Sequence, residues 1–185
     1  MLDVASSSLT PLPDSLSHGL VAVATFGLLS FFCSTSLFLY LTYKIVSWRR
    51  KTIGQGQRAP PINQFLFLVY NLLFADIQQA LAFLLNISAL KNNGIIVGTT
   101  TCWAQGWFIS TGDLASSVFI AAIACHTFFS VVKQYRLPHR MFYCCVAGCW
   151  IFIYGLAIIG IALHPDGFYA RASAWVSCSC SRPSK

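Results

Sequence analysis

The chain contains no glutamate and very little charge of either sign. Only 9% of its 185 residues are charged, whereas a soluble domain typically carries about 25%. Lysine and arginine are also absent from the first 19 residues and from each of the four longest apolar segments. This scarcity of charge, together with a hydrophobic content of 56%, excludes an ordinary soluble domain and predicts a membrane protein.

Four apolar segments exceed the roughly 18 residues that mark a candidate membrane span. We therefore predict an all-α membrane protein whose transmembrane bundle covers residues 20–163. An extracellular tail over 1–19 precedes the bundle, and an outer loop with a C-terminal tail over 164–185 follows it. The predicted transmembrane helices are residues 20–43, 65–90, 103–132 and 142–163.

The few basic residues gather in two of the three loops that connect these spans. Five lie between the first and second spans and three between the third and fourth, whereas the second loop has only Lys91. Positive-inside reasoning places the first and third loops in the cytoplasm and the N-terminus outside. The net charge of +7 is thus explained by membrane topology, and the pattern argues against nucleic acid as a partner.

The second span, 65–90, carries four polar residues near its centre, although it has no Lys, Arg or Glu. A carboxylate at membrane depth usually faces other protein or a wet cavity, and Asp76 is such a residue. At 100° per residue, Asn71 and Gln78 share one side of the helix, and Asp76 and Gln79 share another. Two sides of this helix need protein cover, which predicts that it lies in the middle of the bundle.

The third span, 103–132, carries a second carboxylate, Asp113. Asp113 lies roughly 15 Å along its helix from Trp103, and Asp76 lies roughly 16 Å from Phe65. Because the two helices run in opposite directions, both carboxylates are expected near mid-membrane. No Lys or Arg within the four spans can pair with them. They are therefore protonated, hydrogen-bonded to polar neighbours, engaged with a cation or ligand, or paired with groups outside this chain.

Asp113 belongs to a stripe of mostly small or polar residues along one side of the third span. The spacing of four between Ser117, Ala121 and Cys125 predicts that another helix approaches closely there. Helix packing explains part of this stripe, whereas Asp113 requires a further explanation. The stripe consists of Gly106, Ile109, Ser110, Asp113, Ser116, Ser117, Ile120 and Ala121.

The sequence shows no catalytic or metal-binding constellation. The four histidines lie in scattered contexts, and His126 reads as an interfacial residue at the cytoplasmic end of the third span. Cys144, Cys145 and Cys149 have no nearby His or acid and are predicted to be packing residues. The glycosylation sequon that begins at Asn86 lies at the membrane end of a span and reads as a chance match. We expect no enzymatic activity, no cofactor and no metal.

Four further features occur in one consistent order along the chain. They are Asn71-Leu72-Leu73-Phe74-Ala75-Asp76, Cys102-Trp103, Trp150, and Ala172-Ser173-Ala174-Trp175. Together they resemble the first four helices of a seven-transmembrane G-protein-coupled receptor. The nearest resemblance is to fungal receptors of the cyclic-AMP-receptor-like and glucose-sensing type, which are distantly similar to secretin-family receptors. The Asp-Arg-Tyr motif of rhodopsin-like receptors is absent from the end of the third span.

The resemblance implies a plasma-membrane receptor that binds an extracellular small molecule, such as a nutrient or a cyclic nucleotide. It implies signalling to a heterotrimeric G protein inside the cell. Asp113 and Ser110 are expected near the ligand cavity. Asp76 is expected in a polar network that biases the equilibrium between inactive and active states. The other members of this network are Asn71, Gln79 and Ser116.

In that family the cysteine at the start of the third helix is bonded to a cysteine in the second outer loop, shortly after an Ala-Trp pair. By resemblance Cys102 takes the first role, whereas Trp175 is followed by Val176 and Ser177 rather than by cysteine. The resemblance also places a cluster of cations where a G protein would dock. These cations are Arg49, Arg50, Lys51, Arg136 and Arg140.

The character of the chain changes after Trp175. Residues 176–185 are polar and basic on the predicted outer side, against the trend of the other loops. Val-Ser can be encoded by a splice-donor sequence, so a retained intron, a frameshift and a genuine early stop are all compatible with this tail. As a receptor truncated after its fourth helix, the chain is expected not to signal by itself.

A second hypothesis belongs to a different class of protein. In it the chain is a self-contained four-span membrane adaptor or a small transporter component. Asp76 and Asp113 then line a shared polar pathway or pair across protomers.

Overall fold

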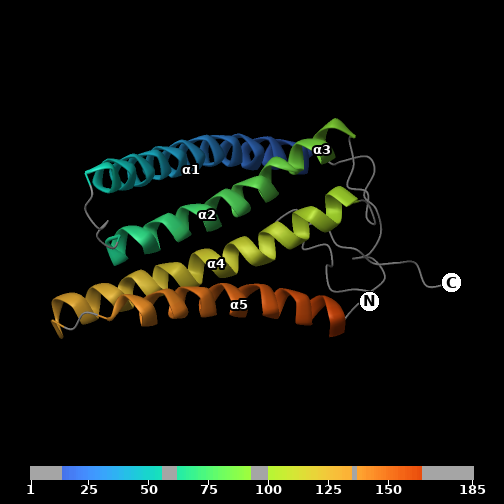
Figure 1. Ribbon diagram of the computed structural model, residues 1–185. Coiled ribbons are helices and arrows are strands. Elements are labelled where there is room, and N and C mark those ends of the chain that lie inside the picture. Colours follow the sequence, from blue (N-terminus) through green and yellow to red (C-terminus); the bar gives the residue numbers. More distant parts are fainter. Residues whose placement is uncertain (1–13, 56–61, 93–99, 135–136, 164–185) are drawn as a thin grey trace.

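The computed structural model describes residues 14–55, 62–92, 100–134 and 137–163, and every regular element in this part of the chain is a helix (Figure 1). Four of these helices are long and apolar enough to cross a membrane. The prediction of an all-α protein with four transmembrane helices is therefore confirmed, and we describe the chain as a multi-pass membrane protein. The helices are α1 (Asp14–Gly54), α2 (Gln64–Leu84), α3 (Asn86–Lys91), α4 (Thr100–Val131) and α5 (His139–Leu163).

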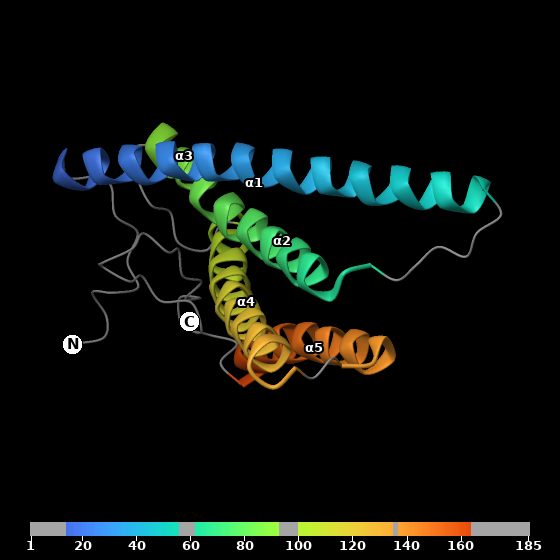
Figure 2. The same ribbon diagram turned by 90° about the vertical axis from the view of Figure 1, so that its left-hand side faces the viewer.

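The long helices lie side by side in the order α1, α2, α4 and α5, and the short α3 lies at one end (Figure 1). Figure 2 shows the same order from the side, with α1 at one edge and α5 at the other. α2 packs against α1, α3, α4 and α5. The helix that was predicted to lie in the middle of the bundle does so.

Consecutive long helices run in opposite directions, as the ring and hydrogen-bond pairs between α1 and α2 illustrate. The rings of Phe38 and Tyr70 are stacked with centroids 4.2 Å apart, and the hydroxyls of Thr42 and Tyr70 lie 3.0 Å apart. Nearer the other end of both helices, Gly27 packs against Phe83. Residue numbers rise along α1 as they fall along α2, which is the signature of an antiparallel pair.

α2 begins with a side-chain cap and ends earlier than its hydropathy predicted. The Asn63 Oδ1 atom accepts a hydrogen bond from the Phe65 backbone N–H at 2.9 Å, which satisfies one of the unpaired donors of the first turn. The predicted span 65–90 is divided at Leu85, where a turn separates α2 from α3. Neither glycine nor proline occurs at this point, so the local sequence did not predict the break.

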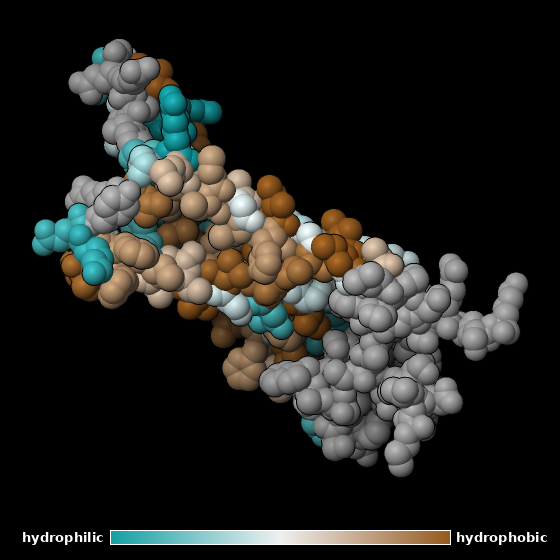
Figure 3. Space-filling view, turned by 90° about the horizontal axis from the view of Figure 1, so that it is seen from below, coloured by the Kyte–Doolittle hydropathy of each residue, from teal (hydrophilic) through white to brown (hydrophobic). Residues whose placement is uncertain are grey.

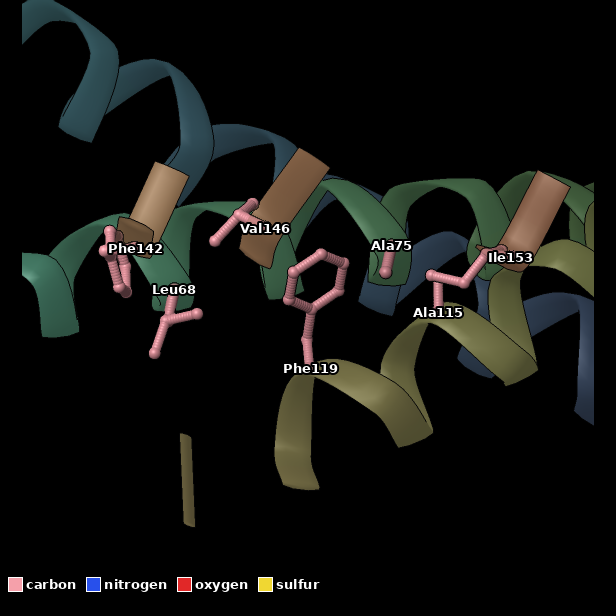
Figure 4. Packing of buried hydrophobic residues seen from close by; sticks show 7 residues of the cluster. All are labelled: Leu68, Ala75, Ala115, Phe119, Phe142, Val146 and Ile153. Carbon is pink, nitrogen blue, oxygen red and sulfur yellow. The ribbon is translucent and has the colours of Figure 1, made fainter. Parts of the chain in front are cut away.

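The apolar core lies between α2, α4 and α5 (Figure 4). Phe119 of α4 is completely buried and occupies the centre of the cluster, beside Ala75 of α2 and Val146 of α5. α1 adds little to this core, since most of its large apolar side chains are exposed. The buried cluster consists of Leu68, Ala75, Ala115, Phe119, Phe142, Val146 and Ile153.

The outer surface of the described helices is largely apolar, and hydrophilic atoms gather at one end (Figure 3). Side chains such as Phe26, Val131 and Ile151 are about 70% exposed, at 71%, 69% and 73%. Exposure of so much apolar surface to water would be unfavourable, whereas in a bilayer the same side chains contact lipid. This surface agrees with the four-span assignment.

Candidate functional site

Hydrogen bonds between the long helices in the described part of the chain centre on α2. Asn71 and Gln78 are bonded to side chains of α5. Asp76 and Gln79 are bonded to side chains of α4. Helical spacing predicted these two polar sides of α2 and the need for protein cover on both. Each side has a neighbouring helix that meets this need.

On the α5 side, two aromatic residues one turn apart donate hydrogen bonds to two amides of α2. The Trp150 Nε1–H donates to Asn71 Oδ1 at 2.9 Å, and the Tyr154 hydroxyl donates to Gln78 Oε1 at 3.2 Å. Asn71 in turn donates from Nδ2 to the carbonyl oxygen of Phe67 at 2.7 Å. Trp150 therefore packs against α2.

On the α4 side, each membrane carboxyl group meets a neutral side chain of the opposite helix. The Ser116 hydroxyl donates to Asp76 Oδ1 at 3.1 Å, and the Gln79 side-chain amide donates to the Asp113 carboxyl group. These two pairs lie one turn apart, because α2 and α4 are antiparallel and each helix supplies residues three positions apart. We call Asp76, Gln79, Asp113 and Ser116 the polar cluster.

The close approach of α2 and α4 beside the polar cluster depends on Gly112. A Cβ atom at this position would lie 2.9 Å from the backbone nitrogen of Gln79 and 3.0 Å from its Cα. Backbone atoms cannot turn aside as a flexible side chain can. Glycine therefore allows the short side chains of Ser116 and Asp113 to reach across the interface.

The polar cluster also borders a cleft of about 380 Å³ between α1 and α2. Asp76 and Gln79 line this cleft from α2, and Gly27 and Ser30 line it from α1. Asp113 is exposed on the neighbouring helix. A carboxyl group that faces lipid is costly, so this side of the bundle is a candidate surface for a ligand or for further protein.

The two residues predicted near a ligand cavity both lie on α4. Asp113 is exposed and belongs to the polar cluster. Ser110 lies one turn nearer the start of α4 and is half-buried. Its hydroxyl donates to the carbonyl oxygens of Gly106 at 2.9 Å and of Trp107 at 3.1 Å. The two side chains are thus neighbours on one helix.

The close helix contact predicted for Ser117, Ala121 and Cys125 is wrong for the described bundle. All three residues are exposed, so no described helix covers them. α4 instead turns Ala115 and Phe119 inward, and both are completely buried. Helix association in a membrane follows the fit between surfaces, and the small Ala115 beside the large Phe119 provides that fit against α2 and α5.

The remaining predicted positions lie at the ends of the helices. Cys102 falls in the first turn of α4, but its side chain and residues 164–185 lie outside the described residues, and so does the predicted disulfide. The last turns of α1 carry Arg49, Arg50 and Lys51, all exposed. Arg140 is exposed in the first turn of α5, and Arg136 lies outside the described residues.

Sequence reasoning missed a polar contact at the basic end of the bundle. Gln64, the first residue of α2, donates from Nε2 to the carbonyl oxygen of Leu137 at 2.7 Å. Its Oε1 lies 3.2 Å from Nε2 of His126 on α4. His126 is therefore joined to α2 rather than being a solitary interfacial residue. The matching depths of Gln64 and His126 in adjacent spans were the available signal.

A second missed contact joins α3 to α4 at the opposite end. The Gln105 side-chain amide donates to Asn86 Oδ1 at 2.6 Å, and Asn86 is only 2% exposed. An asparagine this deeply buried is a poor glycosylation acceptor. Its burial agrees with reading the sequon as a chance match.

The chemistry of these sites is that of neutral donors and carboxyl groups. Among the described residues, no three His, Cys, Asp or Glu side chains come together in a way that could hold a metal ion. Hydrogen bonds between neighbouring helices, such as these, can bind a polar ligand or shift between alternative pairings. Both roles suit the polar cluster and its cleft.

No protein-family model matches this chain, and a comparison with curated proteins finds no similar sequence. The functional proposal therefore rests on the motif residues and on their contacts across the bundle.

Proposed function

We propose that this chain forms the first four helices of a seven-transmembrane G-protein-coupled receptor of the fungal cyclic-AMP-receptor-like or glucose-sensing type. Its N-terminus lies outside the plasma membrane. A small extracellular molecule, such as a nutrient or a cyclic nucleotide, binds toward the outer side. A heterotrimeric G protein docks at the basic end.

One contact carries this proposal. Asn71 and Trp150 are 79 positions apart in the sequence, and the resemblance to receptors rests partly on both of them. They are hydrogen-bonded at 2.9 Å. The receptor resemblance requires both motif residues to lie in one helix bundle, and this contact meets that requirement. Asp76, which ends the same motif in α2, is bonded to Ser116 of α4.

The exposed Asp113 gives further support. A carboxyl group near mid-membrane needs protein or a wet cavity beside it, and Asp113 stays exposed although Gln79 of α2 is bonded to it. Three further helices would supply such cover and would enclose a cavity next to Asp113 and Ser110. In that setting the polar cluster, through Asp76, biases the receptor between its inactive and active states.

Signalling is expected to depend on the polar cluster. Co-expression with helices five to seven of a receptor of the same type should give ligand-dependent G-protein activation, and the chain alone should give none. Asp113→Asn is expected to raise the ligand concentration for half-maximal activation about tenfold, because a hydrogen bond to a charged group contributes roughly 1.5–3 kcal/mol. The measurement is a dose–response curve in cells that carry a G-protein reporter.

Ser117→Ala is the matched control for this experiment. Ser117 is exposed on α4 close to Asp113, and its hydroxyl donates only to the Asp113 backbone oxygen, at 2.9 Å. This change should leave the dose–response curve unaltered. Ligand-dependent activation by the four-helix chain alone would contradict the expectation that it cannot signal.

A four-span adaptor or small transporter component is the second candidate, and the uncovered Asp113 favours it too. In this case Asp76 and Asp113 line a polar pathway or pair across two copies of the chain. Proton- or cation-coupled flux into vesicles that contain the chain should then fall to background in the Asp76→Asn, Asp113→Asn double variant. Flux that the double variant leaves unchanged removes the transporter alternative.

A further inference from the structure

The basic end of the bundle contains a cavity of about 530 Å³. It lies between the first turns of α2 and α5 and the last turns of α4, at the left-hand end of the molecule in Figure 1. Gln64, His126, Ser130 and His139 contribute polar groups to its wall. The proposed receptor function places a G protein at this end of the bundle, but neither it nor its alternative assigns a ligand to this cavity.

One ring nitrogen of His126 is engaged and the other is not. Its Nε2 lies 3.2 Å from Gln64 Oε1, and Gln64 is held in turn by its bond to the Leu137 carbonyl oxygen. Nδ1 of His126 is buried and has no hydrogen-bond partner among the described residues. A buried polar atom without a partner is unfavourable, so a ligand that bonds to it after the imidazole ring turns toward the cavity would gain free energy.

The charge around this cavity has one sign. The described segments that line it, 62–65, 126–131 and 137–140, contain no acid. Arg140 follows the cavity-lining His139 directly and is exposed. α2 and α5 also begin at the cavity, so the positive ends of two long helices point toward it. Together with the imidazoles, these features fit an anion.

The cavity is also partly apolar and lies at the level of lipid headgroups. Ile62, Phe65 and Val131 line it with apolar atoms. His126 follows Asp113 by thirteen residues, which is roughly 20 Å along α4. Half of a hydrocarbon core of about 30 Å separates mid-membrane from the headgroups, so a group near mid-membrane at Asp113 places His126 beyond the core. A ligand with an anionic head group and an apolar body would therefore fit both the polar and the apolar parts of the cavity wall.

We propose that this cavity binds a phosphomonoester and that its source is an anionic phospholipid, such as phosphatidic acid, in the leaflet at the basic end. Near neutral pH a phosphomonoester carries anionic oxygens and an exchangeable proton. It accepts a hydrogen bond from an imidazole N–H, or donates one to the free Nδ1 of His126. A phosphodiester lipid lacks that proton. Assignment to the cytoplasmic leaflet rests on the proposed topology, whereas binding itself does not.

The test uses the purified full chain in detergent after removal of bound lipid. Native mass spectrometry follows its binding to phosphatidic acid, phosphatidylglycerol and phosphatidylcholine with identical short acyl chains. Phosphatidic acid is expected to bind about tenfold more tightly than phosphatidylglycerol, the difference that one hydrogen bond to a charged group provides. Ser130→Leu, which fills the cavity, and His139→Ala, which removes a donor, should each weaken this binding about tenfold.

Arg50→Ala is the matched control, because Arg50 is exposed at the end of α1 and does not line the cavity. It should leave binding of phosphatidic acid unchanged, and circular dichroism should confirm that each variant keeps its helices. Competition with glycerol 3-phosphate distinguishes a phospholipid head group from a soluble phosphomonoester as the ligand. Failure to displace the lipid at millimolar concentration supports a lipid site, and displacement shows that the cavity takes a soluble phosphomonoester instead.

Displacement by glycerol 3-phosphate overturns the phospholipid as the source, and two further results overturn the whole proposal. One is equal binding of phosphatidic acid and phosphatidylglycerol. The other is a loss of binding in Arg50→Ala as large as that in Ser130→Leu, since diffuse surface charge would then hold the lipid. Neither result depends on G-protein activation, so failure here is distinguishable from failure of the proposed receptor function.

Discussion

Gly112→Ala is expected to lower the free energy of unfolding by roughly 1–3 kcal/mol, the usual effect of forcing a methyl group into a well-packed contact. The three nearest atoms to the new Cβ would be N, Cα and Cβ of Gln79, at 2.9, 3.0 and 3.1 Å. Two of these atoms are backbone, so α2 and α4 must separate. Separation would lengthen both hydrogen bonds of the polar cluster.

The measurement is thermal unfolding of the purified chain in detergent. Gly148→Ala and Gly155→Ala on α5 are matched controls, because a Cβ there meets no described atom within 4 Å. Alanine is favoured over glycine in a helix by up to about 1 kcal/mol, so both controls should be neutral or stabilising. Stabilisation by Gly112→Ala as well would mean that α2 and α4 do not approach each other in this way.

Trp150→Ala is expected to lower the free energy of unfolding by roughly 3–5 kcal/mol, the range for removing a large aromatic side chain from a packed interior. The Trp150 ring contacts the rings of Phe74, Phe119 and Tyr154, with centroids 5.5, 5.1 and 5.4 Å away. These rings come from α2, α4 and α5, so the change opens space at the point where three helices meet.

Trp150→Phe tests the contribution of the hydrogen bond to stability separately from that of ring packing. Phenylalanine keeps a ring but leaves Asn71 Oδ1 without the indole N–H, which should cost roughly 1–3 kcal/mol. Adding Asn71→Leu should restore part of that loss, because removing both partners of a buried hydrogen bond is less harmful than removing one. This double-variant comparison also tests the contact that carries the proposed function.

Trp103→Phe is the control for the tryptophan variants. Trp103 is 43% exposed and stacks on Trp107 near the start of α4, with centroids 5.8 Å apart. Its change should alter stability by no more than about 0.5 kcal/mol, as is usual for surface positions. If Trp103→Phe destabilised the chain as much as Trp150→Phe, the hydrogen bond to Asn71 would not be the cause.

Hydropathy and helical spacing predicted which segments cross the membrane and which polar residues share a side of α2. Hydropathy defines spans because a bilayer accepts only long, nearly uncharged helices. The helical period defines faces within one helix, so the different directions of Asn71 and Asp76 followed from their spacing alone. The central place of α2 followed as well, because two polar sides need two neighbours.

The packed bundle was needed to establish how each helix is rotated about its axis and how far it is shifted along its neighbour. The stripe through Ser117 and Cys125 looked like a packing face, yet Ala115 and Phe119 form it. Both sides of α4 contain small residues, and the helical periodicity of its sequence does not determine which side packs against another helix.

The same limit explains the contacts that sequence reasoning missed. Gln64 and His126, or Asn86 and Gln105, pair only once the register between two helices is set. Close approach at Gly112 sets that register between α2 and α4, because the backbone of Gln79 occupies the space of a side chain. The positions of the membrane spans therefore follow from the hydropathy of each segment alone. The polar cluster and the cavity at the basic end depend on how the helices pack against one another.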